Sequence, residues 1–129
     1  MENFLKIFIN VADAVFAVDH RQCVVFWNEA AETLLGISAE EALGQPCWRL
    51  LQGTTPGGRP FCGPNCPILN ALHRNQPVHA LDLLVAGPAQ KLIFTNISTL
   101  FLPPDSESIA ALIHMQRLPE THSQWPEPF

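Results

Sequence analysis

Apolar and polar positions divide the chain into strand-like segments near both ends and helical segments in the middle. Residues 14–19 and 23–27 are mostly apolar and rich in Val, Phe and Trp, and a short polar link separates them. Two such runs predict a β-hairpin. Residues 79–85 alternate between apolar and polar positions, and two longer strands are predicted at 91–102 and 109–116. The chain therefore predicts two strands before the helical region and three after it.

Capping residues mark several short helices between these two groups of strands. Asn28 precedes an apolar helical face and Gly36 follows it, which suits their preferences for the start and end of a helix. Residues 38–41 form a Ser-Ala-Glu-Glu capping box, and Pro67 is expected at the first position of another helix. Hairpin strands with helices grouped between them predict an α+β domain, with the helices on one face of an antiparallel sheet.

The two ends of the chain are predicted to lie outside this domain, which spans residues 13–118. Residues 1–12 place Leu5, Phe8, Ile9 and Ala12 on one helical face. They predict a short amphipathic helix that packs either on its own domain or on a second copy of the chain. Residues 119–129 show no periodicity and are expected to form a flexible tail.

The composition argues against several classes of function. A length of 129 residues suits one domain, and 47% hydrophobic residues allow a real core. The seven basic residues are scattered and the net charge is −5, so the basic stripe typical of nucleic-acid binding is missing. No apolar run is long enough to span a bilayer, and no signal-peptide cleavage site follows the N-terminus. We expect a cytoplasmic protein that binds neither nucleic acid nor membrane directly.

The order of these motifs resembles the PAS domain family from about residue 10 to residue 120. At the exit from the last strand the sequence Arg-Leu-Pro-Glu departs from the Asp-Ile-Thr-Glu-like relay motif that the family often carries. The resemblance implies a five-stranded antiparallel sheet with short helices packed on one face and a pocket between them. The segments that carry the resemblance are 15–19, 25–31, 34–36, 42–44 and 109–117.

The resemblance also implies a sensory module that is not an enzyme. Such domains sense ligands or partners, frequently dimerise, and are usually fused to kinases or transcription regulators. We therefore expect a homodimer that relays a bound ligand, metal or redox cofactor to a partner such as a histidine kinase or a transcription regulator. The alternative is a ligand-free scaffold with the same fold. Catalytic motifs are missing, and the glycine-rich stretch 53–58 is typical of a flexible loop.

The cysteines supply the most informative chemistry. Cys62 and Cys66 form a C-x3-C-P motif before the central helix, as in a cysteine-rich subset of PAS domains, and Cys47 lies shortly before them. Zinc and iron–sulfur clusters take four ligands, for which Cys23, or in the case of zinc a histidine, is the fourth candidate. A redox pair needs only Cys62 and Cys66. The remaining interpretation is that the thiols simply pack.

Four further residues are candidates for contact with a cofactor. Asn28 matches the family's asparagine at the strand-to-helix junction, where it caps the helix or contacts a ligand. Trp48 is expected to line the core or the pocket. His73 on the central helix and His79, which shares the inward parity of Leu81, are candidates to ligate a haem iron or are ordinary histidines at the rim of the core. The sequence does not identify the cofactor.

Overall fold

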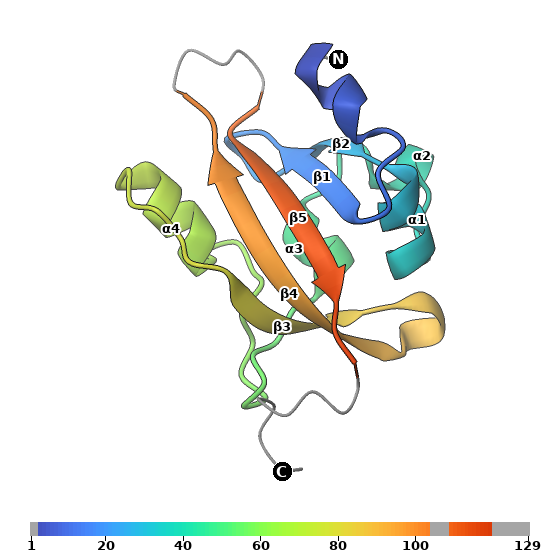
Figure 1. Cartoon of the computed structure of the whole chain (residues 1–129). Helices are drawn as coiled ribbons and strands as arrows, with labels where there is room; N and C mark the ends of the chain where they lie inside the picture. Colours follow the sequence, from blue (N-terminus) through green and yellow to red (C-terminus); the bar gives the residue numbers. More distant parts are fainter. Residues whose placement is uncertain (1–2, 104–108, 120–129) are drawn as a thin grey trace.

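A five-stranded antiparallel sheet forms the centre of the computed structural model, which describes residues 3–103 and 109–119 (Figure 1). The strand order is β2-β1-β5-β4-β3, so the first and last strands of the chain are neighbours in the middle of the sheet. The N-terminal and C-terminal strands of the domain are therefore paired with each other and complete the sheet. The strands are β1 (Ala14–Val18), β2 (Val24–Trp27), β3 (Leu81–Ala86), β4 (Leu92–Phe101) and β5 (Ala111–Arg117).

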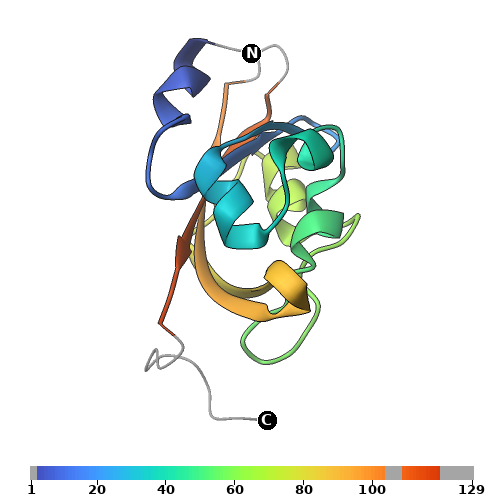
Figure 2. The same cartoon turned by 90° about the vertical axis from the view of Figure 1, so that its right-hand side faces the viewer.

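Four short α-helices lie between β2 and β3 in the chain and cover one face of the sheet (Figure 2). The N-terminal helix η1 (Asn3–Phe8) lies on the opposite side of the sheet. A single 3₁₀ turn, η2 (Pro88–Gln90), connects β3 to β4. The predicted α+β architecture is confirmed. The helices are α1 (Glu29–Leu35), α2 (Ala39–Ala42), α3 (Cys47–Leu51) and α4 (Pro67–His73).

Local sequence explains where these helices begin and end. Asn28 caps α1 through its side chain, and Gly36 ends it with a left-handed φ of 71°, which glycine adopts without steric cost. Ser38 and Glu41 form the predicted capping box at the start of α2. Pro67 occupies the first turn of α4, where its missing N–H is not needed.

The sheet carries an apolar layer on each face. The larger layer lies between the sheet and the helices and includes Phe16, Leu35 and Leu83. The smaller layer lies on the outer face, where Leu5 of η1 packs in one cluster with Leu112 of β5. The N-terminal helix therefore packs on its own domain, which was one of the two predicted arrangements.

The N-terminal segment differs in detail from its prediction. It forms a 3₁₀ helix that ends at Phe8, whereas an α-helical stripe was expected to continue to Ala12. Leu5 is buried, but Ile9 and Ala12 are exposed. A 3₁₀ helix has three residues per turn, so positions spaced for an α-helix no longer share one face.

The glycine-rich segment 53–62 is a narrow hairpin and not the expected irregular loop. Thr54 exchanges two backbone hydrogen bonds with Leu84 of β3, each 2.9 Å long. The Thr55 N–H donates to the Arg59 carbonyl at 2.8 Å and closes the turn. The local sequence conceals this pairing because the partner strand β3 lies far along the chain.

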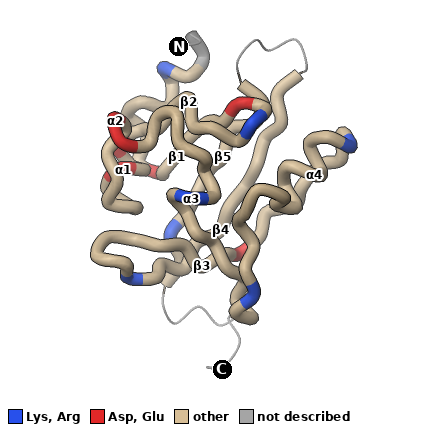
Figure 3. The backbone as a smooth tube through the Cα atoms, turned by 180° about the vertical axis from the view of Figure 1, so that it is seen from behind, with Lys and Arg blue, Asp and Glu red and all other residues tan. Residues whose placement is uncertain are grey.

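The described surface shows basic residues on separate elements, without a continuous basic stripe (Figure 3). Among the described residues, every helix is too short or too polar to cross a membrane. The prediction of a flexible tail concerns residues 120–129, which lie outside the described part of the chain, apart from Pro119.

Candidate functional site

A small apolar cavity of about 60 Å³ lies between the inner face of the sheet and helices α3 and α4. Four strands of the sheet contribute to its wall, among them Phe16 of β1, Leu83 of β3, Ile97 of β4 and Ile113 of β5. Trp48 of α3 also lines it, as the sequence suggested. For scale, an engineered apolar cavity of roughly 150 Å³ stays dry and binds benzene. The cavity therefore accepts only a very small molecule unless its cover moves.

Helix α4 covers this cavity loosely. None of the residues of α4 is buried, whereas α1, which also has seven residues, buries Ala31 and Leu35. Leu72 of α4 and Phe101 of β4 line both the cavity and an adjoining open groove of about 520 Å³. These two side chains thus lie between the cavity and solvent. An element with few buried contacts opens at low free-energy cost.

Three of the four cysteines line the cavity. Cys47 is the first residue of α3, Cys62 lies in the loop before α4, and Cys66 caps α4 by accepting a hydrogen bond from the Leu69 N–H at 3.4 Å. Cys23 is outside the lining and forms an isolated bridge with Pro46. The fold therefore places the three thiols that the sequence grouped around one cavity, and the fourth, Cys23, lies near Cys47 but outside the lining.

Burial raises the pKa of two of these thiols. Removal from water raises the pKa of Cys47 to about 12, with further contributions from the neighbouring thiols of Cys62, Cys66 and Cys23. Burial likewise raises the pKa of Cys62 to about 11, against the opposing effect of a backbone hydrogen bond at Gly53. Because the thiolate is the nucleophile, Cys47 and Cys62 are weak nucleophiles at neutral pH.

The predicted metal site is not found among the described residues, which contain no group of three or more His, Cys, Asp or Glu arranged to hold a metal ion. Structural zinc and iron–sulfur clusters take four ligands. The proposed fourth ligand, Cys23, lies outside the cavity lining. The described residues therefore do not assemble a donor set for either metal group.

His73 and His79 lie outside the cavity lining, so neither is placed to ligate a haem iron there. Both side chains are exposed, and His73 lines the adjoining groove. The predicted inward alternation holds for Leu83 and Val85, which are buried in the inner layer. It fails for His79 because β3 begins only at Leu81, so His79 is not part of the pleated strand.

Asn28 has a structural role in this fold. Its side-chain oxygen accepts hydrogen bonds from the N–H groups of Val15 at 3.0 Å and Ala31 at 2.9 Å. Its amide group donates to the carbonyls of Phe8 at 2.9 Å and Asp13 at 3.0 Å. Asn28 does not line the cavity. It connects the N-terminal segment, β1 and α1, and no hydrogen-bonding capacity remains for a ligand.

Gln22 is a cavity residue that the sequence did not single out. It lies in the turn between β1 and β2 and is only 5% exposed. Its Nε2 donates to the Pro64 carbonyl at 3.3 Å, whereas its Oε1 is buried without a hydrogen-bond partner. A polar residue in a hairpin turn normally faces solvent. Here the loop before α4 covers the turn, and only the tertiary fold reveals this.

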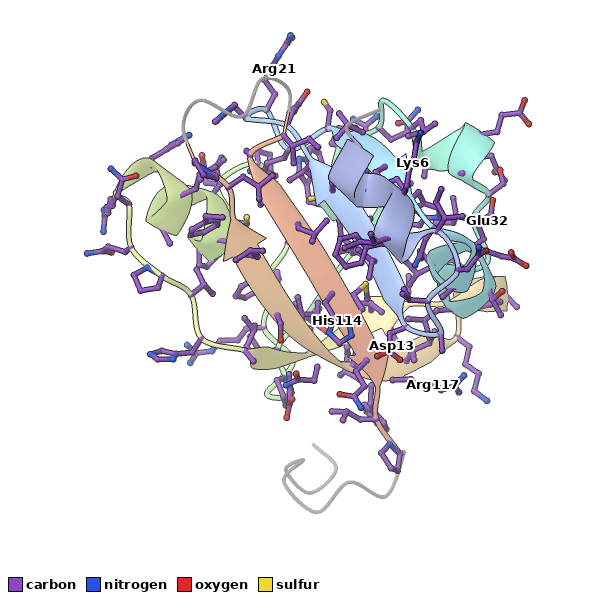
Figure 4. The ribbon with its side chains drawn as sticks, turned by 45° about the horizontal axis from the view of Figure 1, so that its top comes forward. Lys6, Asp13, Arg21, Glu32, His114 and Arg117 are labelled. Atoms are coloured by element: carbon purple, nitrogen blue, oxygen red, sulfur yellow. The ribbon has the colours of Figure 1, made fainter. Side chains whose placement is uncertain are left out.

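The outer face of the sheet holds the N-terminal segment against β5. His114 Nε2 lies 2.9 Å from Asp13 Oδ2, and the two side chains point toward each other in Figure 4. Leu112 packs beneath η1 on the same face. On its other face, β5 contributes Ala111 and Ile113 to the cavity wall. One strand therefore contacts both the cavity and the N-terminal segment.

Comparison with known proteins agrees with this architecture. A family model described as the PAS fold matches residues 2–60. The PAS domain of a protein from Colwellia psychrerythraea superposes with a TM-score of 0.66 at 21% identity, covering 89% of this chain and 93% of the other. The PAS domain of nitrogen regulation protein NR(II) from Vibrio parahaemolyticus gives 0.63 at 16% identity, covering 92% and 100%.

A light-oxygen-voltage domain studied with a flavin analogue gives a TM-score of 0.71 at 17% identity, covering 95% of this chain and 89% of that domain. No curated protein sequence matches the chain significantly. The chain thus has the PAS fold, as predicted. The match to the family model supports its placement in the PAS domain family.

Proposed function

We propose that this chain is a sensory PAS module whose input is a small, largely apolar molecule held in the cavity beneath α4. The observation that carries the proposal is an apolar cavity whose covering helix has no buried residue. A molecule in the cavity makes apolar contacts with Ile68, Leu69 and Leu72 of α4, which line it. Binding therefore stabilises one position of α4 over others.

The cavity thiols belong to this sensor site in the proposal. The Cys62–Cys66 motif is the feature that resembles the cysteine-rich subset of PAS domains. Because burial favours the neutral form of Cys47 and Cys62, we assign the thiols a role as soft, polarizable lining. A metal centre, a haem and a redox pair are not part of the proposal. The module acts by binding and has no catalytic role.

Strand β5 is the proposed route from the cavity to a partner. It lines the cavity with one face and holds the N-terminal segment with the other. Ile7 and Ile9 of that segment are 69% and 40% exposed, which suits contact with a second copy of the chain. The partner class we propose is a kinase or a transcription regulator. The presence of this fold in a two-component sensor histidine kinase supports that choice.

Xenon tests the proposal because it enters dry apolar cavities without needing a polar contact. In proton–nitrogen correlation spectra under xenon pressure, we expect shifts at cavity residues, slower amide exchange in α4 and a smaller change in η1. Ala111→Leu fills the cavity from β5 and should abolish the xenon shifts. The control Leu92→Ala, at a residue that is 57% exposed and outside the cavity, should keep them.

A ligand-free scaffold predicts a different result. In that case xenon causes no shift in the cavity, or the shifts occur while exchange in α4 and η1 stays the same. Either result rejects the sensor proposal, because occupancy of the cavity must change the cover and the outer face for a signal to leave the domain.

A further inference from the structure

The cavity contains one polar atom whose hydrogen-bonding requirement is not met. Gln22 Oε1 is buried without a partner, and Thr99 Oγ1 is the one other such side-chain atom among the described residues. Thr99 as a whole is partly exposed and lines the open groove outside this cavity. Gln22 instead lines a cavity with almost entirely apolar walls. An unpartnered buried oxygen destabilises the folded state, so it calls for a partner that the protein itself does not supply.

Water is a poor partner for this oxygen. A buried water molecule needs two to four polar contacts. The nearest candidate besides Gln22 is Asp19, which also lines the cavity, but its Oδ1 already accepts hydrogen bonds from the N–H groups of Arg21 and Cys23, each at 2.9 Å. The remaining polar side-chain groups of the lining are the second carboxylate oxygen of Asp19, the Trp48 indole N–H and the weakly donating thiols. A water molecule would therefore have few strong partners in a cavity whose walls are almost entirely apolar.

The protein holds the Gln22 amide in one orientation. Because the Pro64 carbonyl can only accept, the NH₂ group must face it, and the oxygen faces the other way. The Gln22 backbone is fixed as well: its N–H donates to the Asp19 carbonyl at 3.0 Å, and its carbonyl accepts from the Cys47 N–H at 2.8 Å. Its φ of 70° is uncommon outside glycine, so the surrounding contacts determine this conformation.

We infer that the ligand of this cavity is a small neutral molecule with an apolar body and one hydroxyl or N–H group, which donates a hydrogen bond to Gln22 Oε1. The inference rests on the proposed function, since it requires the cavity to be a ligand site. Gln22 is then the residue that determines specificity. A molecule of the same shape without a donor leaves the oxygen unpaired and binds less tightly.

The cavity thiols favour the hydroxyl form of this ligand. Burial keeps Cys47 and Cys62 protonated, with pKa values raised to about 12 and about 11. Their S–H groups are weak donors. A hydroxyl group can donate to Gln22 and also accept from a thiol, whereas an N–H group can only donate.

Two pairs of probes that differ in the donor test this inference. Pyrrole and furan have nearly the same shape, as do phenol and toluene, but only pyrrole and phenol donate a hydrogen bond. We titrate each into the full chain and follow backbone amide shifts, with the Cys47 amide as reporter because it donates to Gln22. The donor of each pair should bind about tenfold more tightly than its isostere.

Variants of two glutamines assign the preference to one residue. Gln22→Met retains the side-chain length and should reduce the preference to less than about twofold. Gln52→Met is the matched control, since Gln52 also has a positive φ, of 48°, but is exposed and outside the cavity. It should keep the preference. In the unmodified chain, the Gln22 side-chain amide signal should shift with pyrrole and not with furan, which gives a readout even if Gln22→Met does not fold.

Each other outcome overturns the inference. If furan and toluene bind at the cavity as tightly as their partners, Gln22 does not set specificity, while the proposed sensor site stands. If Gln22→Met keeps the preference, or Gln52→Met loses it equally, the assignment to Gln22 is wrong. If none of the four probes shifts cavity resonances, both the inference and the proposed sensor site fail.

Discussion

Asn28 and Gln22 are both buried amide side chains, 3% and 5% exposed, but they are used in opposite ways. Asn28 makes four hydrogen bonds that connect β1, α1 and the N-terminal segment. Gln22 makes one side-chain hydrogen bond, and its oxygen has no partner. A fully satisfied buried amide stabilises a fold, whereas an unsatisfied one lowers stability in exchange for a binding group.

The helices next to these residues differ in the same way. α1, which Asn28 caps, buries Ala31 and Leu35, while α4, on the cavity side, has no fully buried residue. One side of the helical layer is thus well packed and the other is held loosely over a small cavity. In this fold, the well-packed end of the helical layer, at α1, supplies rigidity, and the loosely held end, at α4, gives a ligand access to the cavity.

The largest effect is expected from breaking the satisfied amide. Asn28→Ala removes the helix cap and leaves the Val15 N–H and the carbonyls of Phe8 and Asp13 without their partner. We expect the free energy of unfolding to fall by on the order of 4 kcal/mol. Gln22→Met removes an oxygen that has no partner and should change it by less than about 1 kcal/mol. Urea denaturation measures both, and equal losses would contradict the comparison.

A smaller effect is expected from truncating one leucine in each helix. Leu35→Ala in α1 creates a cavity in the packed layer and should lower the free energy of unfolding by about 3 kcal/mol. Leu72→Ala in α4 removes a half-buried side chain and should lower it by about 1 kcal/mol. The second variant should also speed amide exchange in α4. Similar losses in urea denaturation would mean that α4 is packed as firmly as α1.

The smallest effect near neutral pH concerns the ionisation of Cys47. The pKa of Cys47 is about 12 in the folded chain, against 9.0 for an ordinary thiol. Above pH 9.0 the unfolded chain loses a proton that the folded chain retains until about pH 12, so stability falls as pH rises through this range. The loss is at most about 1.4 kcal/mol per pH unit and is absent below the lower value.

Cys47→Ala should reduce this pH dependence in urea denaturation, and the part that comes from Cys62, whose pKa is raised to about 11, should remain. The control Cys23→Ala, at a thiol outside the cavity, should retain most of it. If the two variants show the same slope as the unmodified chain, the Cys47 thiol is not buried as described.

Periodicity and caps predicted much of the fold because both act between neighbouring residues. The alternating pattern placed Leu83 and Val85 on the inner face, and Asn28 and Gly36 bounded α1 as expected. The same pattern wrongly placed His79 in the strand, because alternation alone does not show at which residue strand pairing begins. The hairpin at 53–62 was missed for a related reason, since Thr54 pairs with Leu84 of β3, which is remote in sequence.

The candidate site was predicted only in part. Cys47, Cys62 and Cys66, which the sequence grouped as candidates, all line the cavity, and Trp48 lines it as well. Spacing alone did not show that Cys47 reaches the same cavity as the other two, that burial keeps two of these thiols neutral, or that Cys23 lies outside the lining. These properties depend on how much water and how many other side chains surround each sulfur atom.

By itself, the sequence determined the order of the strands and helices and the places where α1 and α2 begin, because those depend on neighbouring residues and on hydrophobic periodicity. Only the tertiary structure shows that Gln22, from a hairpin turn, is buried and lines the same cavity as three thiols. It also shows that α4, which covers this cavity, has no fully buried residue. The physical reason is that burial is a property of the assembled chain. The Pro64 loop and α4 cover Gln22 only after β3, β4 and β5 complete the sheet against which they pack.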